Sequence, residues 1–288
     1  MNTPDPLAIH QDPVFFREAV SFTAADTSFA PRLVEKDYFC TLLLAHLGAL
    51  DPLVFKGGTC LAKVYAGFYR LSEDLDFAAS LPVDAPRQVR RNFAEPLRRA
   101  VAALPPPFRN PSPMTGHNNS LQYNGAAVYT SLLDGREESI HIELSLREPL
   151  LIPPQSQAVR TVLLDPLTGR NMVEGVTVNC IAEQEAFAEK IRAALSRRDV
   201  AIRDFFDLDH AVRNLSLVPT DAALIALVKQ KLSIPGNEPV NVSAVRLALL
   251  RGQLEGRLRP VLRTSDFAAF DLNRAIALIT TIAAALQQ

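Results

Sequence analysis

The spacing of apolar positions changes along the chain and divides it into successive stretches. Over residues 14–50 apolar residues recur at helical spacing. Over residues 53–180 short apolar runs lie between Gly, Pro and Asp turns, which is typical of strands. Beyond that the spacing is helical again, so we expect a core domain over residues 1–181 and a helical domain over residues 182–288. The order of helices, mixed sheet and helices predicts an α+β fold.

The middle stretch predicts particular strands and helices. Residues 57–59 are expected to form a tight turn, with Thr59 capping a helix that reaches about Tyr69. A further helix, rich in Arg, is expected over residues 86–103 and is interrupted at Pro96. The strands are expected at residues 53–55, 74–78, 121–132, 139–146, 159–164 and 176–180.

The composition is that of a globular protein. Of the 288 residues, 48% are apolar and 21% are charged, which excludes a disordered chain, a collagen and a coiled coil. No apolar run is long enough to cross a bilayer, and residues 1–13 lack the apolar centre of a signal peptide. The 3 cysteines are widely spaced, which fits reduced thiols. We therefore expect a cytoplasmic protein with no membrane partner.

The charge balance limits the partners. With 30 basic and 31 acidic residues the net charge is −1, which argues against nonspecific coating of nucleic acid but allows a local basic groove. Only six of the basic residues are lysines, so each retained lysine is informative. Arginines cluster over residues 87–99 and 246–274. Either cluster could follow an RNA backbone, and Arg-rich solvated helices are the alternative interpretation.

Residues 55–77 contain the pattern that points to chemistry. A Gly57-Gly58 turn at a helix N-terminus offers backbone N–H groups and the positive end of the helix dipole, and both favour a phosphate. Asp74 and Asp76 fall on one face of the next strand, where two carboxylates can hold a Mg²⁺ ion that bridges substrate phosphates. Either feature alone is usually a plain turn or a solvated strand face. Together on adjacent strands they predict phosphoryl or nucleotidyl transfer.

Later segments add candidates, each with a structural alternative. Glu143 lies on the polar face of an alternating strand and is a candidate third ligand or base, unless it is simply solvated. Lys190 suits a triphosphate as a compact charge, unless it is a surface lysine. Arg203 and Asp207 have the i, i+4 spacing of an ordinary helix salt bridge. Lys63 lies one turn into the first predicted helix, where it either helps to hold the triphosphate or points to solvent.

The strand, Gly-Gly turn, helix and Asp-x-Asp strand resemble the minimal signature of DNA polymerase β-like nucleotidyltransferases. More narrowly, residues 55–59 (FKGGT) and 70–77 (RLSEDLDF) are similar to the AbiEii/AbiGii family. Its members are nucleotidyltransferase toxins of type IV toxin–antitoxin and abortive-infection systems. The resemblance extends over residues 30–215, where Lys190 and residues 203–208 (RDFFDL) match later family motifs. It implies a polymerase β-like core of mixed sheet and flanking helices, followed by a helical domain.

The resemblance also implies an activity: transfer of a nucleoside monophosphate from an NTP to RNA, in particular the tRNA 3′ end, under the control of a cognate antitoxin. Asp74 and Asp76 are expected to hold one or two Mg²⁺ ions, and Asp76 to receive the acceptor proton with help from Glu143 or Asp207. The residues expected to hold the NTP are Gly57, Gly58, Thr59, Lys63, Ser72 and Lys190.

Two rival functions remain open on the sequence. One is a nucleotidyltransferase that modifies a protein or a small molecule. A small-molecule enzyme would need a closed, often acidic pocket instead of an open basic groove. The other rival is a non-catalytic relative that binds a nucleotide or a protein partner on the same fold. The intact Asp74 and Asp76 pair argues against the second rival.

Overall fold

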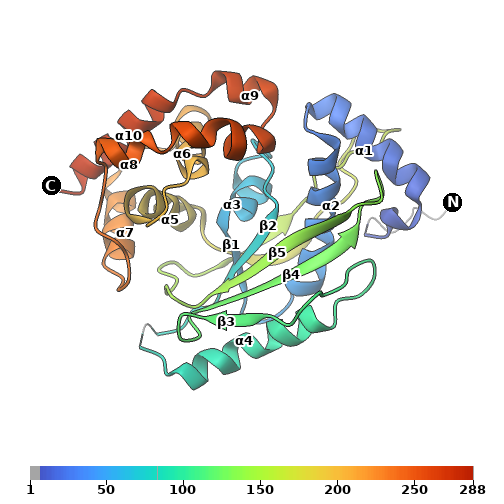
Figure 1. The fold of residues 1–288 in the computed structure, drawn as a ribbon, viewed down its shortest axis with the longest axis horizontal. Coiled ribbons are helices and arrows are strands. Elements are labelled where there is room, and N and C mark those ends of the chain that lie inside the picture. The colour runs from blue at the N-terminus through green and yellow to red at the C-terminus, as the bar shows by residue number, and fades with distance from the viewer. Residues whose placement is uncertain (1–6, 83, 288) are drawn as a thin grey trace. The chain divides into compact units, whose positions relative to one another are not determined.

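The computed structural model describes residues 7–82 and 84–287 (Figure 1). It divides into two compact units, residues 1–181 and residues 182–288, which are described separately below. Residues 1–6, which begin the segment where we expected no signal peptide, lie outside the described residues. Among the described residues, no helix combines the length and the apolar character that crossing a bilayer requires.

The first unit is built on a seven-stranded mixed sheet in the order β3-β4-β5-β2-β1-β7-β6, counted over the described residues. Strand β1 pairs antiparallel with β2 and parallel with β7, β2 pairs parallel with β5, and the remaining neighbours are antiparallel. The mixed sheet with flanking helices confirms the predicted α+β fold. The strands are β1 (Val54–Lys56), β2 (Asp74–Ala78), β3 (Thr115–His117), β4 (Gln122–Thr130), β5 (Glu137–Ser145), β6 (Gln155–Val159) and β7 (Val176–Cys180).

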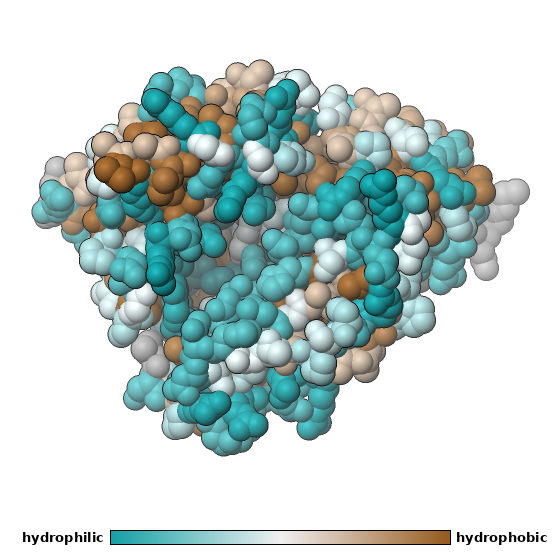
Figure 2. Space-filling view, viewed as in Figure 1, coloured by the Kyte–Doolittle hydropathy of each residue, from teal (hydrophilic) through white to brown (hydrophobic). Residues whose placement is uncertain are grey.

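Strand alternation gives this sheet one apolar and one polar face. Phe55, Phe77 and Leu144 are register neighbours on the apolar face, and all are buried. Helix α1 (Pro13–Thr27) packs on α2 (Pro31–Leu47), and Phe39 of α2 stacks on Tyr129 of β4 with ring centroids 4.0 Å apart. In Figure 1 α2 passes behind β4 and β5, so the viewer faces the opposite side of the sheet. Figure 2 shows that the surface over these strands is mainly hydrophilic.

The helix after the Gly-Gly turn differs from the prediction. Helix α3 (Gly57–Cys60) already begins at the first glycine, and a π-helical turn (Leu61–Tyr65) follows and ends before Tyr69. The prediction that Thr59 caps this helix is wrong. Its buried hydroxyl donates to the backbone carbonyl of Asp74, so it fastens α3 to β2 instead.

The prediction of a strand over residues 159–164 is also wrong beyond its first residue. Strand β6 ends at Val159. The hydroxyl of Thr161 and the backbone N–H of Val162 then donate to the carboxylate of Asp37 on α2, each at 2.8 Å. Because these donors bind a helix side chain and not a neighbouring strand, the segment leaves the sheet.

Two smaller differences concern the segment between β2 and β4. Helix α4 (Arg87–Ala102) continues through Pro96 without interruption. Pro96 is exposed, and a proline removes only one backbone donor from the helix ladder. The short strand β3 was not predicted, because its three residues are exposed and carry no apolar alternation.

The second unit is helical throughout its described residues. Helix α5 packs against α6 and α7, and α6 packs against α10. Phe205 and Leu208 of α6 and Ile279 of α10 are fully buried in its core. The sequence predicts helix starts near residues 183, 200, 220, 242 and 266, and α5 to α9 begin within about two residues of these positions. Helix α10 was not predicted separately. The helices are α5 (Glu183–Ser196), α6 (Ile202–Asn214), α7 (Ala222–Leu232), α8 (Ala244–Ala248), α9 (Thr264–Ala269) and α10 (Leu272–Ala285).

Candidate functional site

The Gly57-Gly58 turn contacts the side chains of the neighbouring strand. Gly57 has φ +77°, and a Cβ added to it would lie 2.1 Å from Oδ2 of Asp76. A Cβ on Gly58 would lie 2.6 Å from the Arg70 guanidinium and 3.4 Å from Oγ of Ser72. Only glycine therefore allows the backbone to approach the Asp76 carboxylate this closely. The turn therefore lies directly against Asp76 and Ser72.

The carboxylates lie in a row on the polar face of the sheet. Asp76 is in register with Lys56 of β1 on one side and with Glu143 of β5 on the other. Adjacent strands lie about 4.8 Å apart, and directly opposed residues point to the same face. Asp74, two residues earlier on β2, shares this face and is in register with His141. The structure thus places Asp74, Asp76 and Glu143 on one face of two neighbouring strands, as the alternation of strand residues predicts.

The donor chemistry of this row fits a magnesium ion. Asp74 and Asp76 are partly buried and offer the hard carboxylate oxygens that Mg²⁺ prefers. Within the part of the chain that the structure describes, no three His, Cys, Asp or Glu side chains are gathered closely enough to hold a metal by themselves. Mg²⁺ usually keeps several waters and takes one or two carboxylates together with substrate phosphates. A pair of carboxylates next to a glycine turn at a helix N-terminus, where phosphates can bind, fits that requirement.

Arg70 is a residue of the candidate site to which the sequence analysis gave no role. Its side chain is only 1% exposed, its guanidinium lies against Gly58, and it stacks over the ring of Tyr69 at 5.6 Å. A guanidinium stays charged when buried, so it holds a fixed positive charge beneath the turn. Arg70 opens the 70–77 motif, and its place in that motif was the available signal.

An ionic network on the other side of the sheet fixes the start of β2. Glu73 accepts hydrogen bonds from Arg32 at 2.9 Å and from Lys36 at 3.1 Å. Glu138 of β5 accepts from Arg32 at 2.6 Å. Burial alone would raise the pKa of Glu73, but Lys36 and Arg32 together lower it below its ordinary value. The residue before Asp74 is therefore tied to α2 as an ionised carboxylate.

The structure corrects the prediction for Lys63. This lysine neither faces a triphosphate nor points to solvent: it is 2% exposed, and its ammonium lies 2.5 Å from Oδ1 of Asp37. It also donates to the hydroxyl of Thr41 at 2.8 Å and to the carbonyl of Arg160 at 3.3 Å. Because these partners occupy its three donors, Lys63 is a structural residue of the first unit.

Lys190 and Asp207 come together in the second unit. The ammonium of Lys190 on α5 lies 2.9 Å from Oδ1 of Asp204 and 2.8 Å from Oδ2 of Asp207 on α6. The Asp207 side chain is fully buried and that of Lys190 is 14% exposed. Asp207 therefore pairs across two helices, where its spacing from Arg203 had suggested a salt bridge along one helix.

Two arginines of the predicted RNA-binding surfaces have structural roles. Arg90 is buried and donates to the carbonyl of Asn119 at 2.9 Å. Arg246 is buried and donates to the carbonyls of Ala194 and Arg197 at 2.7 and 2.8 Å. These two residues cannot follow an RNA backbone, and the surfaces are smaller than the sequence suggested.

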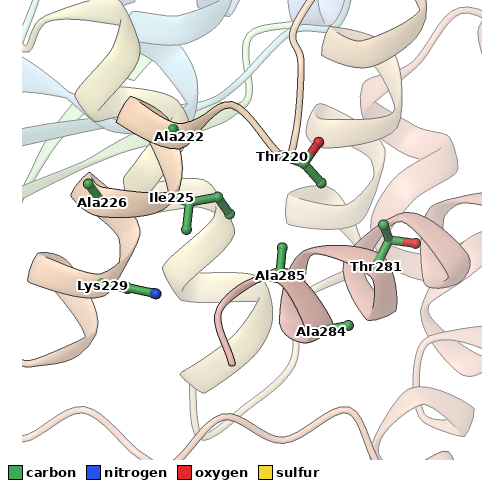
Figure 3. A pocket seen from close by; sticks show the side chains of 8 residues that line it. All are labelled: Thr220, Ala222, Ile225, Ala226, Lys229, Thr281, Ala284 and Ala285. Atoms are coloured by element: carbon green, nitrogen blue, oxygen red, sulfur yellow. The ribbon is translucent and has the colours of Figure 1, made fainter. Parts of the chain in front are cut away.

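A cavity of about 520 Å³ lies between α7 and α10, within the second unit (Figure 3). Thr220, Ile225, Lys229 and Thr281 point toward it, and small alanine side chains complete its wall. It contains none of the predicted site residues. Its lining is mostly apolar and holds no carboxylate, so it does not suit a metal-bound nucleotide.

A comparison with known families identifies the family of this chain. The model of the family described as nucleotidyl transferase AbiEii toxin, type IV TA system, matches residues 41–277. The chain therefore belongs to the AbiEii family of nucleotidyltransferase toxins, and the predicted resemblance is confirmed. The enzyme class, nucleotidyltransferase, follows from this membership.

Two solved structures from Helicobacter pylori are similar to this chain. One is JHP933, with 17% identity and a TM-score of 0.44, covering 88% of each chain. The other has a provisional assignment as a nucleotidyltransferase, with 17% identity and a TM-score of 0.42, covering 88% of this chain and 90% of that one. A search of curated proteins gave no match.

Proposed function

We propose that this protein is a cytoplasmic, Mg²⁺-dependent toxin that transfers a nucleoside monophosphate from an NTP to the 3′ end of an RNA, in particular tRNA, and that a cognate antitoxin controls it. The main support is the close approach of the Gly57-Gly58 turn to Asp76. The approach supports the proposal because a backbone turn at a helix N-terminus can bind phosphate and the carboxylate beside it can hold Mg²⁺. Membership of the AbiEii family supports the toxin and antitoxin parts of the proposal.

In this proposal each residue of the candidate site has a distinct task. Asp74 and Asp76 hold Mg²⁺, which neutralises charge on the phosphates. Gly57 and Gly58 offer backbone N–H groups to the triphosphate, and Ser72 adds a hydroxyl beside them. Asp76 or its register neighbour Glu143 receives the proton of the attacking hydroxyl. Most of the rate enhancement comes from positioning and charge, as is usual for transfer of this kind.

Thr59 has a smaller part than expected, because its hydroxyl is bound to the Asp74 carbonyl. It holds turn and strand together. The roles of Lys190 in binding the triphosphate and of Asp207 in assisting proton transfer stay predictions. Replacing Lys190 by Met and measuring the KM for NTP tests the first of them.

An open acceptor site favours a macromolecule over a small molecule. Within the first unit, Glu143 and Asp76 are partly exposed and His141 is exposed, so solvent reaches this face. An RNA 3′ end can reach such a face, whereas a small-molecule site normally encloses its ligand. This observation supports RNA as the acceptor.

The reaction is tested by incubating purified protein with total tRNA and each α-³²P NTP in turn. We expect label at tRNA length with Mg²⁺ and none when EDTA removes the metal. Asp76→Asn, which keeps the side-chain shape, should lose at least about a hundredfold in rate. Asp199→Asn, at an exposed position of the second unit, is the matched control and should keep the wild-type rate. Undiminished label with Asp76→Asn, or in EDTA, would overturn the assignment of the metal site.

The RNA acceptor and the toxicity of the protein are tested by separate measurements. Label that appears on protein or on a small molecule in cell lysate, with none on RNA, would keep the enzyme and reject the RNA acceptor. Induced expression of the wild-type chain should arrest growth, and Asp76→Asn should not. Growth arrest that is equal in both would reject nucleotidyl transfer as the cause of toxicity.

A further inference from the structure

The row of residues across the sheet has a direction. It runs from Lys56 on β1 through Asp76 and Glu143 to Asn124 on β4, each in register with the next. The Gly57-Gly58 turn follows directly after β1 and lies against Asp76. A triphosphate held by that turn therefore places its pyrophosphate at the β1 end of the row. In nucleotidyl transfer the attacking and leaving oxygens are roughly in line through the phosphorus. The acceptor hydroxyl must then approach from the opposite end, over β5 and β4.

The chemistry of that end suits a nucleoside better than a phosphate backbone. The side chains on the polar face beside Glu143 include no Lys or Arg: they are two amides, an imidazole, a hydroxyl and a methyl group. They are Gln122, Asn124, Ala126, His141 and Ser145. Phosphates are bound chiefly by Lys, Arg and backbone N–H groups, whereas ribose hydroxyls pair with neutral polar side chains.

Asn124 is the residue of this face that is prepared for a ligand. Its side-chain oxygen is buried and has no hydrogen-bond partner among the described residues. Its neighbours, in contrast, are already engaged: Gln122 accepts from Asn118 at 3.3 Å, and Thr115 bonds to His117 at 2.9 Å. Buried side-chain oxygens are normally paired, so an unpaired oxygen beside the row of carboxylates calls for an explanation.

We infer that Asn124 is a specificity-determining residue that binds the ribose 2′-hydroxyl of the acceptor's terminal nucleotide. This inference rests on the proposed function. The terminal 3′-hydroxyl faces Asp76 and Glu143, and the 2′-hydroxyl lies on the next carbon of the ribose. Asn124 lies one strand beyond Glu143, about 4.8 Å further along the row. The amide can turn about its last bond and offer either an acceptor or a donor to this hydroxyl.

The transfer step is balanced without a further reactant. The 3′ oxygen forms a bond to the α-phosphorus of the NTP, and the bond from that phosphorus to the pyrophosphate oxygen breaks. The proton of the 3′-hydroxyl passes to the carboxylate of Asp76 or Glu143. Asn124 takes no part in the proton transfer. It holds the ribose so that the 3′ oxygen points along the row.

The test is a cycle that combines one protein change with one substrate change. The rates of wild type and Asn124→Ala are measured on an RNA ending in an ordinary ribose and on the same RNA ending in a 2′-deoxyribose. We expect Asn124→Ala to lower kcat/KM for the ribose acceptor about tenfold, as loss of one hydrogen bond does. We expect no further loss on the deoxy acceptor, and an unchanged KM for NTP. Gln122→Ala, on the same face of β4, is the matched control, and its effect should be equal on both acceptors.

The outcomes separate this inference from the proposed function. If the losses from Asn124→Ala and from the deoxy terminus multiply, the residue does not bind the 2′-hydroxyl and the inference is wrong. An equal rise in the KM for NTP would give Asn124 a role in NTP binding and also overturn it. If the wild type labels no RNA of either kind, the proposed acceptor itself is wrong.

Discussion

At the scale of single residues, Gly57 is where backbone conformation and chemistry depend on each other. We predict that Gly57→Ala abolishes transfer, because the added Cβ would lie 2.1 Å from the Asp76 carboxylate and must displace it. The change also forces alanine into a left-handed conformation at φ +77°, which costs about 1 kcal/mol of folding stability. The measurement is kcat together with the midpoint of thermal unfolding.

Gly67 supplies the control for this prediction. It has a similar φ of +60°, but a Cβ there would meet nothing within 4 Å. Gly67→Ala should therefore lower the unfolding midpoint about as much as Gly57→Ala and leave kcat unchanged. Equal loss of activity in both variants would show that general destabilisation causes the loss of kcat. The contact with Asp76 would then not be its cause.

The Lys63 and Asp37 pair gives a second prediction at this scale. Both side chains are at most 2% exposed, so Lys63→Met leaves an uncompensated carboxylate in the interior. We expect a loss of about 3–5 kcal/mol in the free energy of unfolding, measured with urea. The double variant Lys63→Met, Asp37→Asn should recover part of it, because a neutral amide still accepts from Thr161 and Val162 and needs no counter-charge.

Lys229→Met is the matched control, since Lys229 is exposed at the rim of the α7 and α10 cavity. It should change the unfolding free energy by less than about 0.5 kcal/mol. A Lys63→Met variant that is as stable as the wild type but has a raised KM for NTP would restore Lys63 to the nucleotide site.

At the scale of elements, the join between α2 and β2 depends on the charge of Glu73. Its folded-state pKa is depressed, so it stabilises the fold above its ordinary pKa of 4.5, and this contribution is lost as the pH falls through the lower folded-state value. We predict that Glu73→Gln is less stable than the wild type at pH 7, and that the difference shrinks once the pH falls below about 4.5. Urea unfolding at a series of pH values measures it.

Glu95 provides the comparison, because it forms pairs with Arg98 and Arg99 on the exposed surface of α4. Glu95→Gln should have almost no effect in the presence of salt, since exposed pairs are screened. A pH-independent loss from Glu73→Gln would indicate that shape and hydrogen bonding matter at this join and that charge does not.

The elements also show which parts of the structure a sequence can predict. Strands β1 and β2 and the turn between β1 and α3 follow from local patterns, namely an apolar run, two glycines and a period of two. Strand β3 has no such pattern and exists because β4 offers it a partner. Residues 160–164 have the sequence pattern of a strand, but Thr161 and Val162 donate hydrogen bonds to the carboxylate of Asp37 on α2. Long-range partners of this kind leave no local signal.

The same distinction holds within the site. That Asp74, Asp76 and Glu143 share one face could be predicted, because strand alternation alone determines the face of each residue. The buried partner of Lys63 was not found, since Asp37 lies 26 residues earlier in the chain. Arg70 and Asn124 were missed for a related reason, because the interest of each depends on its surroundings in the fold. Arg70 lies against the Gly58 backbone, and the buried side-chain oxygen of Asn124 has no hydrogen-bond partner among the described residues.

At the scale of the whole molecule, each unit has a core and a buried ion pair of its own. In the first unit Lys63 pairs with Asp37, and in the second Lys231 pairs with Glu185 at 2.6 Å, with both side chains fully buried. A unit of about 100 residues with its own core is large enough to fold alone. We therefore predict that residues 182–288, expressed separately, form a helical domain that unfolds in one cooperative transition.

Far-ultraviolet circular dichroism and urea unfolding of this fragment test the prediction. Lys231→Met should lower its free energy of unfolding by about 3–5 kcal/mol, because the charge of Glu185 would lose its buried partner. The same change in the full chain should destabilise only the transition that belongs to the second unit. A fragment that is helical but unfolds without cooperativity would show that its core needs residues 1–181, and that the two units are one folding domain.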